Sequence, residues 1–321
     1  MATFVPLRRA VLFIAVFFAT LIFIKVQELT VLSTNLDSIE RKDEIRFKLM
    51  IGYASGYPLR HIHRLASAFE ALTSADCRIV LFSDAHPNLE TQKFTKLELI
   101  SPKDVLLLED TGFHNPAFER YVVINTWLRK YSHRFSKVIM TDARDIALFG
   151  DPFSQIEYDF EGVQSFTEVV TYEYDHWYNQ VWVRDCYGQE FLDEIISEKV
   201  TCCGVIAGSI KGVLSYLDAF VLELRSKGVC HGAGTDTAIH VWIIHKILYD
   251  SIIVDSTRAV ITHAPKWGHN ASLQLTLDSR FDSLGRLLNE IGQPYALIHQ
   301  ADRFPQIWDP YCAQYTTNSS S

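Results

Sequence analysis

Short apolar runs alternate with helix-patterned stretches in the first half of the chain, and this alternation constrains the fold more than any other sequence feature. KLMIGYASGYP (48–58) reads as a strand that ends in a Gly/Pro loop, and HRLASAFEALTSAD (63–76) carries apolar residues at helical spacing. RIVLFSD (78–84) reads as a second short strand. Strand, helix and strand in succession predict an α/β sheet.

The next strand leads directly into two acidic residues. NPAFERYVVINTWLRKYSHRFSK (115–137) places Tyr121, Ile124 and Leu128 on one face of a predicted helix, and the strand after it ends at Asp142, three residues before Asp145. Ligands of open parallel sheets bind outside the carboxyl ends of the strands. The two aspartates therefore lie where chemistry is expected.

The residue types alone leave two interpretations of this pair open. In the first, the segment is an ordinary loop in which Asp142 caps a turn and Arg144 forms a surface ion pair. In the second, the carboxylates of Asp142 and Asp145 are hard oxygen ligands for magnesium or manganese, and the ion keeps positions open for substrate phosphates.

The N-terminus carries a targeting signal. Arg8 and Arg9 precede an uninterrupted apolar run over 10–24, which is short beside the about 20 residues of a typical membrane span, so a secretory signal peptide is the alternative. No small-x-small cleavage site follows the run, and the basic pair stands on its N-terminal side, so we expect an uncleaved signal anchor with a lumenal body. The predicted organisation is a cytoplasmic N-terminus (1–9), a transmembrane anchor (10–26), a stem (27–46), one folded domain (47–310) and a C-terminal tail (311–321).

Composition restricts the classes of partner. A formal net charge of -8 argues against nucleic acid as the main partner, because phosphate binding needs clustered Lys and Arg. The six cysteines show no Cys-x-x-Cys spacing, so the sequence does not favour a zinc site. In a lumenal compartment some of them are expected to form disulfides. Glycosylation sequons at Asn270 and Asn318 fit the same compartment.

Four segments in order carry a resemblance to a known family. TDARDIALFGDPF (141–153) resembles the T-D-x-R-D-x-x-x-x-x-D-P-F signature of a group of GT-A-fold, metal-dependent glycosyltransferases of the D-x-D type. Segments 179–209, 235–246 and 295–303 resemble that group's N-x-x-W-[IV] and C-S-G-x-x-x-G elements, its D-Q-x-x-x-N helix and its closing H-Q-Y-D-R element. Together the matches cover roughly 48–305.

The resemblance implies both a fold and a function. The fold is α/β of the GT-A type, with a Rossmann-like, mostly parallel central sheet flanked by helices and a smaller β element on the acceptor side. The function is transfer of a sugar from a nucleotide sugar, a UDP-sugar rather than a GDP-sugar, to a hydroxyl of a glycan or glycoprotein, with Mn²⁺ or Mg²⁺ holding the diphosphate. With the N-terminal anchor, a single-pass type II protein of the Golgi or another secretory-pathway membrane is expected.

The sequence departs from the family pattern at four positions. Cys203 stands in place of serine, Thr237 in place of glutamine, His240 near the place of asparagine, and Ala301 in place of tyrosine. Thr237 and His240 could change the sugar or acceptor preference. The departures at Thr237, His240 and Ala301 motivate an alternative function, a catalytically silent GT-A domain that serves as a glycan-binding or scaffolding subunit.

The resemblance also assigns the metal ligands. Asp145 is the expected direct ligand, Asp142 contacts the ribose or the metal and its water shell, and His299 is the third protein ligand. His263 and His269 are rivals of His299 for that position, and Lys266 between them could hold a phosphate.

Three further charged residues are expected at the donor. Arg120 would reach the nucleotide, or it is a charge on the helix surface. Arg144 touches phosphate or pairs with an aspartate. Asp236 is the expected catalytic carboxylate beside the transferred sugar, and a helix N-cap is its structural alternative.

Glycines and aromatic residues complete the expected site. Gly204 and Gly208 would let the backbone approach the donor sugar or acceptor, or they form a tight turn of a β-hairpin. The aromatic residues of 172–182 are expected mostly in the core, although one exposed ring would suffice to stack on a sugar acceptor.

Overall fold

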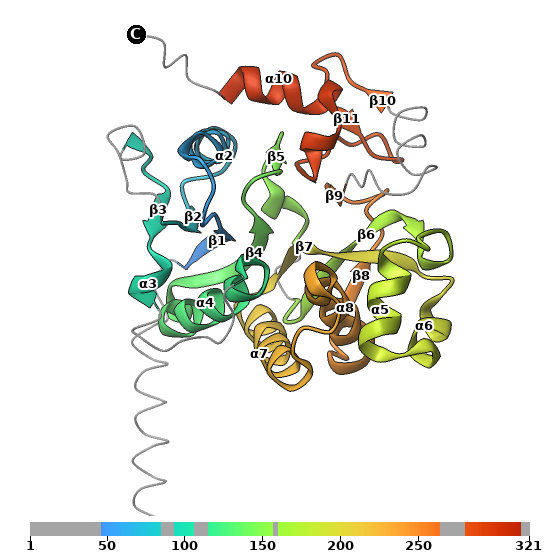
Figure 1. Ribbon diagram of the computed structural model, residues 1–321. Coiled ribbons are helices and arrows are strands. Elements are labelled where there is room, and N and C mark those ends of the chain that lie inside the picture. The colour runs from blue at the N-terminus through green and yellow to red at the C-terminus, as the bar shows by residue number, and fades with distance from the viewer. Residues whose placement is uncertain (1–45, 85–92, 106–114, 157–159, 264–279, 316–321) are drawn as a thin grey trace, which may run out of the picture. The chain divides into compact units, whose positions relative to one another are not determined.

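The structure is a computed structural model, and its described residues all belong to one compact unit. They are residues 46–84, 93–105, 115–156, 160–263 and 280–315 (Figure 1). Among them, no helix combines the length and the apolar character that crossing a membrane requires. The predicted anchor at 10–26 and the sequons at Asn270 and Asn318 lie outside the described residues, as do Lys266 and His269.

A seven-stranded sheet forms the centre of the unit. Its strands follow the order β3-β2-β1-β4-β7-β6-β8, and all neighbours are parallel except that β7 runs antiparallel to both β4 and β6. This sheet confirms the predicted mostly parallel α/β architecture. The strands are β1 (Phe47–Tyr53), β2 (Cys77–Phe82), β3 (Leu97–Ile100), β4 (Phe135–Asp142), β6 (Val163–Thr171), β7 (Lys199–Ser209) and β8 (Ser251–Val254).

Helices cover both faces of this sheet (Figure 1). On one face α4 and α7 bury Tyr121 and Phe220, whose rings stack with centroids 3.5 Å apart. On the other face α2 packs with α10 and the second sheet. The helices are α2 (Leu59–Leu72), α3 (Pro102–Val105), α4 (Pro116–Tyr131), α5 (Asn179–Tyr187), α6 (Gln189–Ile195), α7 (Ile210–Lys227), α8 (Thr235–Trp242) and α10 (Pro305–Tyr315).

A three-stranded sheet adds the C-terminal part of the chain to the unit. Its order is β5-β12-β9, in which β12 pairs antiparallel with β5 and parallel with β9. Because α10 runs to Tyr315 and buries Tyr311 completely, the folded unit includes residues that were predicted as a tail from 311. The remaining strands are β5 (Ala147–Leu148), β9 (Ile261–His263), β10 (Arg280–Phe281), β11 (Leu287–Leu288) and β12 (Leu297–His299).

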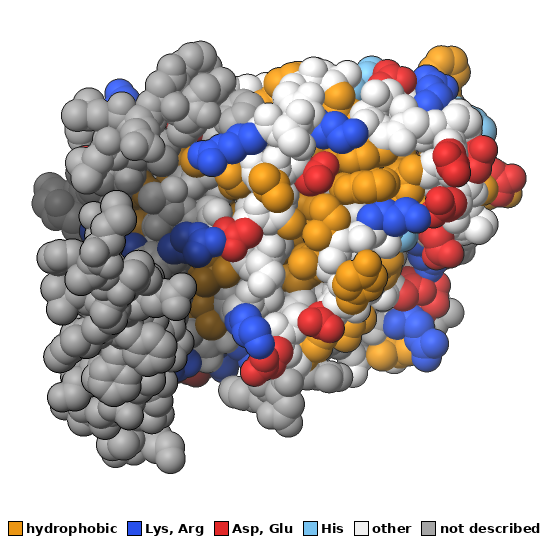
Figure 2. Space-filling view, turned by 90° about the horizontal axis from the view of Figure 1, so that it is seen from below, with side chains coloured by type: hydrophobic (Ala, Val, Ile, Leu, Met, Phe, Trp, Pro, Cys, Tyr) orange, Lys and Arg blue, Asp and Glu red, His pale blue; other side chains and the backbone are white. Residues whose placement is uncertain are grey.

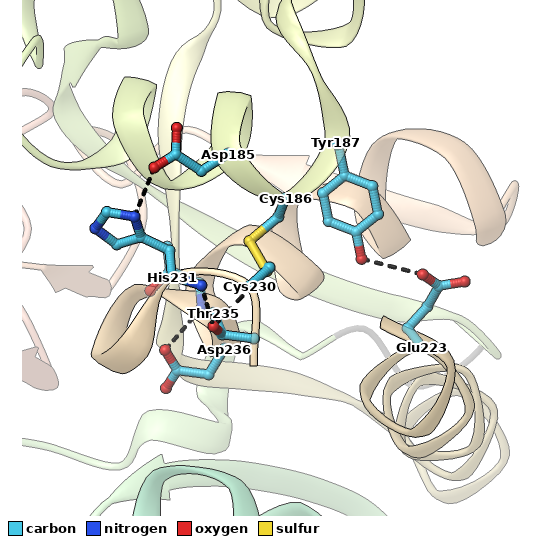
Figure 3. Close-up of a disulfide and its surroundings, with 9 residues drawn as sticks. Asp185, Cys186, Tyr187, Glu223, Cys230, His231, Thr235 and Asp236 are labelled. Atoms are coloured by element: carbon cyan, nitrogen blue, oxygen red, sulfur yellow. Dashed lines mark hydrogen bonds and ion pairs between the residues drawn. A yellow bond between two sulfur atoms is a disulfide. The ribbon is translucent and has the colours of Figure 1, made fainter. Parts of the chain in front are cut away.

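A disulfide joins α5 to the loop before α8 (Figure 3). Cys186 and Cys230 form it, with Cα atoms 5.2 Å apart. Beside it, His231 Nδ1 lies 2.7 Å from an Asp185 carboxylate oxygen, and the backbone N–H of His231 donates to Thr235 Oγ1. The pairing expected for some cysteines is therefore present, and it holds the start of α8 against α5.

The surface carries charges of both signs. On the face shown in Figure 2, Lys and Arg side chains lie intermingled with Asp and Glu around an area of hydrophobic side chains. The described part of this face thus has no continuous basic surface of the kind that a polyanion requires.

Candidate functional site

A cavity of about 460 Å³ opens at the carboxyl ends of β1, β4 and β12. Its walls come from the carboxyl ends of β1 and β4, the middle of β6 and β7, the starts of α4, α5 and α8, and the end of β12. Most of the predicted site residues lie in or directly beside these walls. Those that line the cavity are Arg120, Asp142, Gly204, Asp236 and His299.

The structure brings Asp142, Asp145 and His299 together. One side-chain ligand atom from each lies within 4.8 Å of the other two. His299 Nε2 is 3.1 Å from Asp142 Oδ2 and 3.7 Å from Asp145 Oδ1. Two carboxylates and one imidazole form a donor set that fits Mn²⁺ or Mg²⁺, and Asp142 and His299 face the cavity from which a substrate phosphate would reach the ion.

Backbone connections fix this geometry. Asp142 is the last residue of β4 and stands opposite Tyr53 at the end of β1. After His299, Gln300 adopts a left-handed conformation with φ of 60°, which is uncommon for a residue with a side chain. This turn lets the backbone N–H of Ala301 donate to the carbonyl oxygen of Asp145 at 3.0 Å, so the end of β12 is tied to the loop after β4.

The charges in this cluster shift one another's pKa values. Burial alone would raise the pKa of Asp142, but Arg120 and His299 outweigh burial and hold it well below its usual range. Burial raises the pKa of Asp145, and the Asp142 charge adds to that increase. Burial would lower the pKa of His299, yet Asp145 and Asp142 together raise it. The cluster therefore favours positive charge between the two carboxylates.

Arg120 bridges two acidic residues of the cavity. Its guanidinium forms an ion pair with Asp142, and its Nη2 lies 3.0 Å from Asp236 Oδ2. The side chain is largely buried, at 14% relative exposure, so the alternative that Arg120 is a surface charge of α4 is wrong. Arg120 instead links the end of β4 to α8.

Arg144 also pairs with carboxylates. Its Nη2 is 3.1 Å from Asp145 Oδ2, and its Nη1 is 3.2 Å from Asp302 Oδ2. The side chain is 45% exposed and does not line the cavity. Of the two expected roles, the structure therefore favours the ion pair over the phosphate contact.

The two glycines have different surroundings. Both lie inside the continuous strand β7, so the alternative of a hairpin turn is wrong. A Cβ on Gly204 would meet His299 Cε1 at 2.0 Å, which means that only glycine leaves room for this imidazole. A Cβ on Gly208 would meet the carbonyl oxygen of Gly162 at 2.4 Å, away from the cavity. The expected approach of Gly208 to a ligand is thus wrong, because it approaches a neighbouring strand instead.

The residues that depart from the family pattern fall into two environments. Cys203 and Thr237 line the cavity beside Asp236, and burial raises the pKa of the Cys203 thiol to about 12. His240 does not line it: its ring contacts Ser165 Oγ and Tyr216 Oη, each at 3.0 Å, in the interior. Ala301 is completely buried. A direct contact of His240 with a sugar is therefore excluded by its position.

Two carboxylates of the cavity were not predicted from the sequence. Glu168, in β6, is 7% exposed, and burial raises the pKa of its carboxyl to about 7 with a contribution from the charge of Asp175. Asp175 accepts a hydrogen bond from Asn179 Nδ2 at 2.5 Å. The signal that could have revealed Glu168 is an acidic residue in the otherwise uncharged strand VQSFTEVVT.

The aromatic residues of 172–182 are less buried than expected. Tyr172 is fully buried, whereas Tyr174 and Trp177 are 65% and 79% exposed. Tyr178 and Trp182 line the cavity, and their rings meet edge to face with centroids 5.6 Å apart. The prediction that most of them lie in the core is wrong, and two rings are available in the cavity wall.

Similarity to known proteins is found in the structure and not in the sequence. The chain matches no family model and no curated protein. A crystal structure of the galactosyltransferase LgtC in complex with donor and acceptor sugar analogs is similar over 84% of this chain and 96% of that chain, at 9% sequence identity and a TM-score of 0.48.

Proposed function

We propose that this chain is a metal-dependent glycosyltransferase of the GT-A type. The observation that carries the proposal is the Asp142–Asp145–His299 cluster, which is assembled from two distant segments at the wall of a cavity. The same residues belong to sequence segments that resemble the D-x-D and closing elements of that family.

Asp142, Asp145 and His299 would hold a divalent cation, Mn²⁺ or Mg²⁺. Such an ion would neutralise the diphosphate that leaves the donor sugar. The ion pairs of Arg120 and Arg144 keep two carboxylates oriented, so little reorganisation is required when a ligand enters.

Asp236 would be the carboxylate beside the transferred sugar. It lines the cavity, burial raises its pKa, and Arg120 opposes this increase and fixes the position of one of its oxygens. Thr237, next in the chain, adds a hydroxyl to the same wall. A carboxylate held in this way can accept a hydrogen bond from a sugar hydroxyl.

The acceptor would be a hydroxyl of a glycan or glycoprotein, and the donor a UDP-sugar. The edge-to-face rings of Tyr178 and Trp182 in the cavity wall offer apolar surface to the flat face of a saccharide. The apolar run at 10–24, with Arg8 and Arg9 before it, supports a type II membrane protein of the Golgi or another secretory-pathway compartment.

The test is turnover of a panel of nucleotide sugars by the full-length protein, with manganese or with a chelator, in the presence of mixed glycan acceptors. We expect release of one nucleoside diphosphate that requires both the metal and an acceptor, and its loss in Asp145→Asn. Cys312→Ser is the matched control, because its thiol lies away from the cavity and contacts Arg64. No metal-dependent turnover of any donor by a folded sample would refute the proposal.

A further inference from the structure

A second group of possible metal ligands lies behind the first and shares one residue with it. Cys202, His263 and His299 each present a ligand atom within 4.8 Å of the other two. His299 Nδ1 is 2.8 Å from His263 Nδ1 and 3.7 Å from Cys202 Sγ. The carboxylates of Asp142 and Asp145 contact the opposite ring nitrogen, Nε2.

We propose that Cys202, His263 and His299 Nδ1 form a binding site for a soft divalent cation, zinc above all. One thiolate and two imidazoles are the ligands that zinc prefers, whereas the neighbouring carboxylates suit magnesium and manganese. The site itself does not depend on the proposed transferase activity.

The positions of the three ligands fit a tetrahedral zinc ion. With Zn–S of about 2.3 Å and Zn–N of about 2.0 Å, such an ion separates sulfur from nitrogen by about 3.5 Å and two nitrogens by about 3.3 Å. The sulfur–nitrogen distance of 3.7 Å matches this geometry, and the nitrogen–nitrogen distance of 2.8 Å requires the two rings to move slightly apart. The fourth position would face the cavity, which Cys202 and His299 line.

The fold holds these ligands on strands. Cys202 belongs to β7, and His263 and His299 stand opposite each other in the parallel pair of β9 and β12. Their relative exposures are 7%, 0% and 2%, so a bound ion would be shielded from water. Gly204 leaves the space in which the His299 ring reaches this position.

Asp142 supplies the outer partner that a zinc-bound histidine usually has. A ligating histidine donates its other ring N–H to a carboxylate in many zinc sites. His299 Nε2 lies 3.1 Å from Asp142 Oδ2, so zinc on Nδ1 would place the remaining proton on Nε2 and direct it to this carboxylate. Zinc binding would also release the Cys202 thiol proton to solvent.

The shared imidazole makes the two sites mutually exclusive. A neutral imidazole has one ring nitrogen with a free lone pair, so His299 can serve zinc through Nδ1 or the carboxylate-bound cation through Nε2, but not both. This exclusivity, unlike the zinc site, rests on the metal role proposed for Asp142 and Asp145. It makes zinc an inhibitor of manganese binding.

The test uses Co²⁺ as a spectroscopic probe for the full-length protein under anaerobic conditions. We expect one equivalent of Co²⁺ to give a thiolate-to-cobalt charge-transfer band that one equivalent of Zn²⁺ removes. Cys202→Ser and His263→Asn should lose the band and lower zinc affinity more than about 100-fold, beyond the loss typical of an outer-shell partner. Cys203→Ser is the matched control, because its thiol contacts Asp236 and Thr237 instead of His299.

The outcomes separate this proposal from the transferase proposal. Asp145→Asn should keep the cobalt band while losing manganese binding, which is read from the signal of free Mn²⁺ in electron paramagnetic resonance. A wild-type protein that gives no thiolate band at saturating Co²⁺, or a Cys202→Ser variant that keeps the band, would overturn the zinc site. The wild-type spectrum decides even if a variant fails to fold.

Discussion

Replacing Glu168 by glutamine should stabilise the protein at neutral pH. The carboxyl is 7% exposed, and burial raises its pKa from 4.5 to about 7. In the unfolded chain it ionises near 4.5, so the folded state holds the proton over this interval and loses stability as the pH rises through it. Each pKa unit corresponds to about 1.4 kcal/mol, so the ionised carboxylate costs about 3 kcal/mol by pH 8.

Urea unfolding of the wild type and of Glu168→Gln between pH 4.5 and 8 measures this effect directly. The difference in free energy of unfolding should grow by about 3 kcal/mol in favour of Glu168→Gln over that range. Glu173→Gln, at an exposed position two residues beyond the end of the same strand, is the matched control for the substitution itself. A difference between wild type and Glu168→Gln that does not change with pH would show that the Glu168 carboxyl does not ionise at a raised pKa in the folded protein.

Three other substitutions test separate parts of the structure. Asp236→Asn should lower kcat about 100-fold or more while nucleotide-induced thermal stabilisation remains, and equal loss of both would contradict its role beside the sugar. Burial lowers the pKa of His240 to about 3, so the unfolded chain takes up a proton below about pH 6.5 that the folded state does not, and wild-type stability falls by up to about 1.4 kcal/mol per pH unit. His240→Gln should therefore reduce the slope of stability against pH in this acid range, and an unchanged slope would exclude this cause. The double change Cys186→Ala and Cys230→Ala should cost about 4 kcal/mol in chemical unfolding, since the disulfide closes a loop with a sequence separation of 44, and a wild-type-like midpoint would contradict that estimate.

The sequence predicts the first half of the fold well because its signals are local. The apolar strand that ends at Asp142 and the helix before it follow from periodicity alone, and both are present as β4 and α4. The burial of Arg120 does not follow, because it depends on Asp142 and Asp236, and Asp236 lies 116 residues away. The predicted role of Gly208 is wrong for the same reason, because it depends on a segment distant in the sequence: the backbone of Gly162 and Val163, and not a ligand, packs against Gly208.

In the candidate site too, local sequence motifs predict some features, whereas contacts between distant segments are not predictable from the sequence. His299 could be assigned from its motif, but periodicity does not reveal that its second nitrogen faces Cys202 and His263, because three different strands bring these side chains together. The absence of Cys-x-x-Cys spacing led to the prediction of no zinc site, and this spacing says nothing about ligands from separate strands. Glu168 was missed because one acidic residue in a strand has no distinctive spacing.

The most direct test of the proposed donor site is a thermal-shift measurement on the full-length protein with UDP, GDP and CMP, each with and without manganese, alongside Asp145→Asn. A nucleotide at one hundred times its dissociation constant should stabilise the fold by about 2.7 kcal/mol. UDP should raise the melting temperature only with manganese, and Asp145→Asn should abolish the increase. No stabilisation by any nucleotide, or an equal increase without manganese or in Asp145→Asn, would contradict a metal-dependent nucleotide site at Asp142, Asp145 and His299.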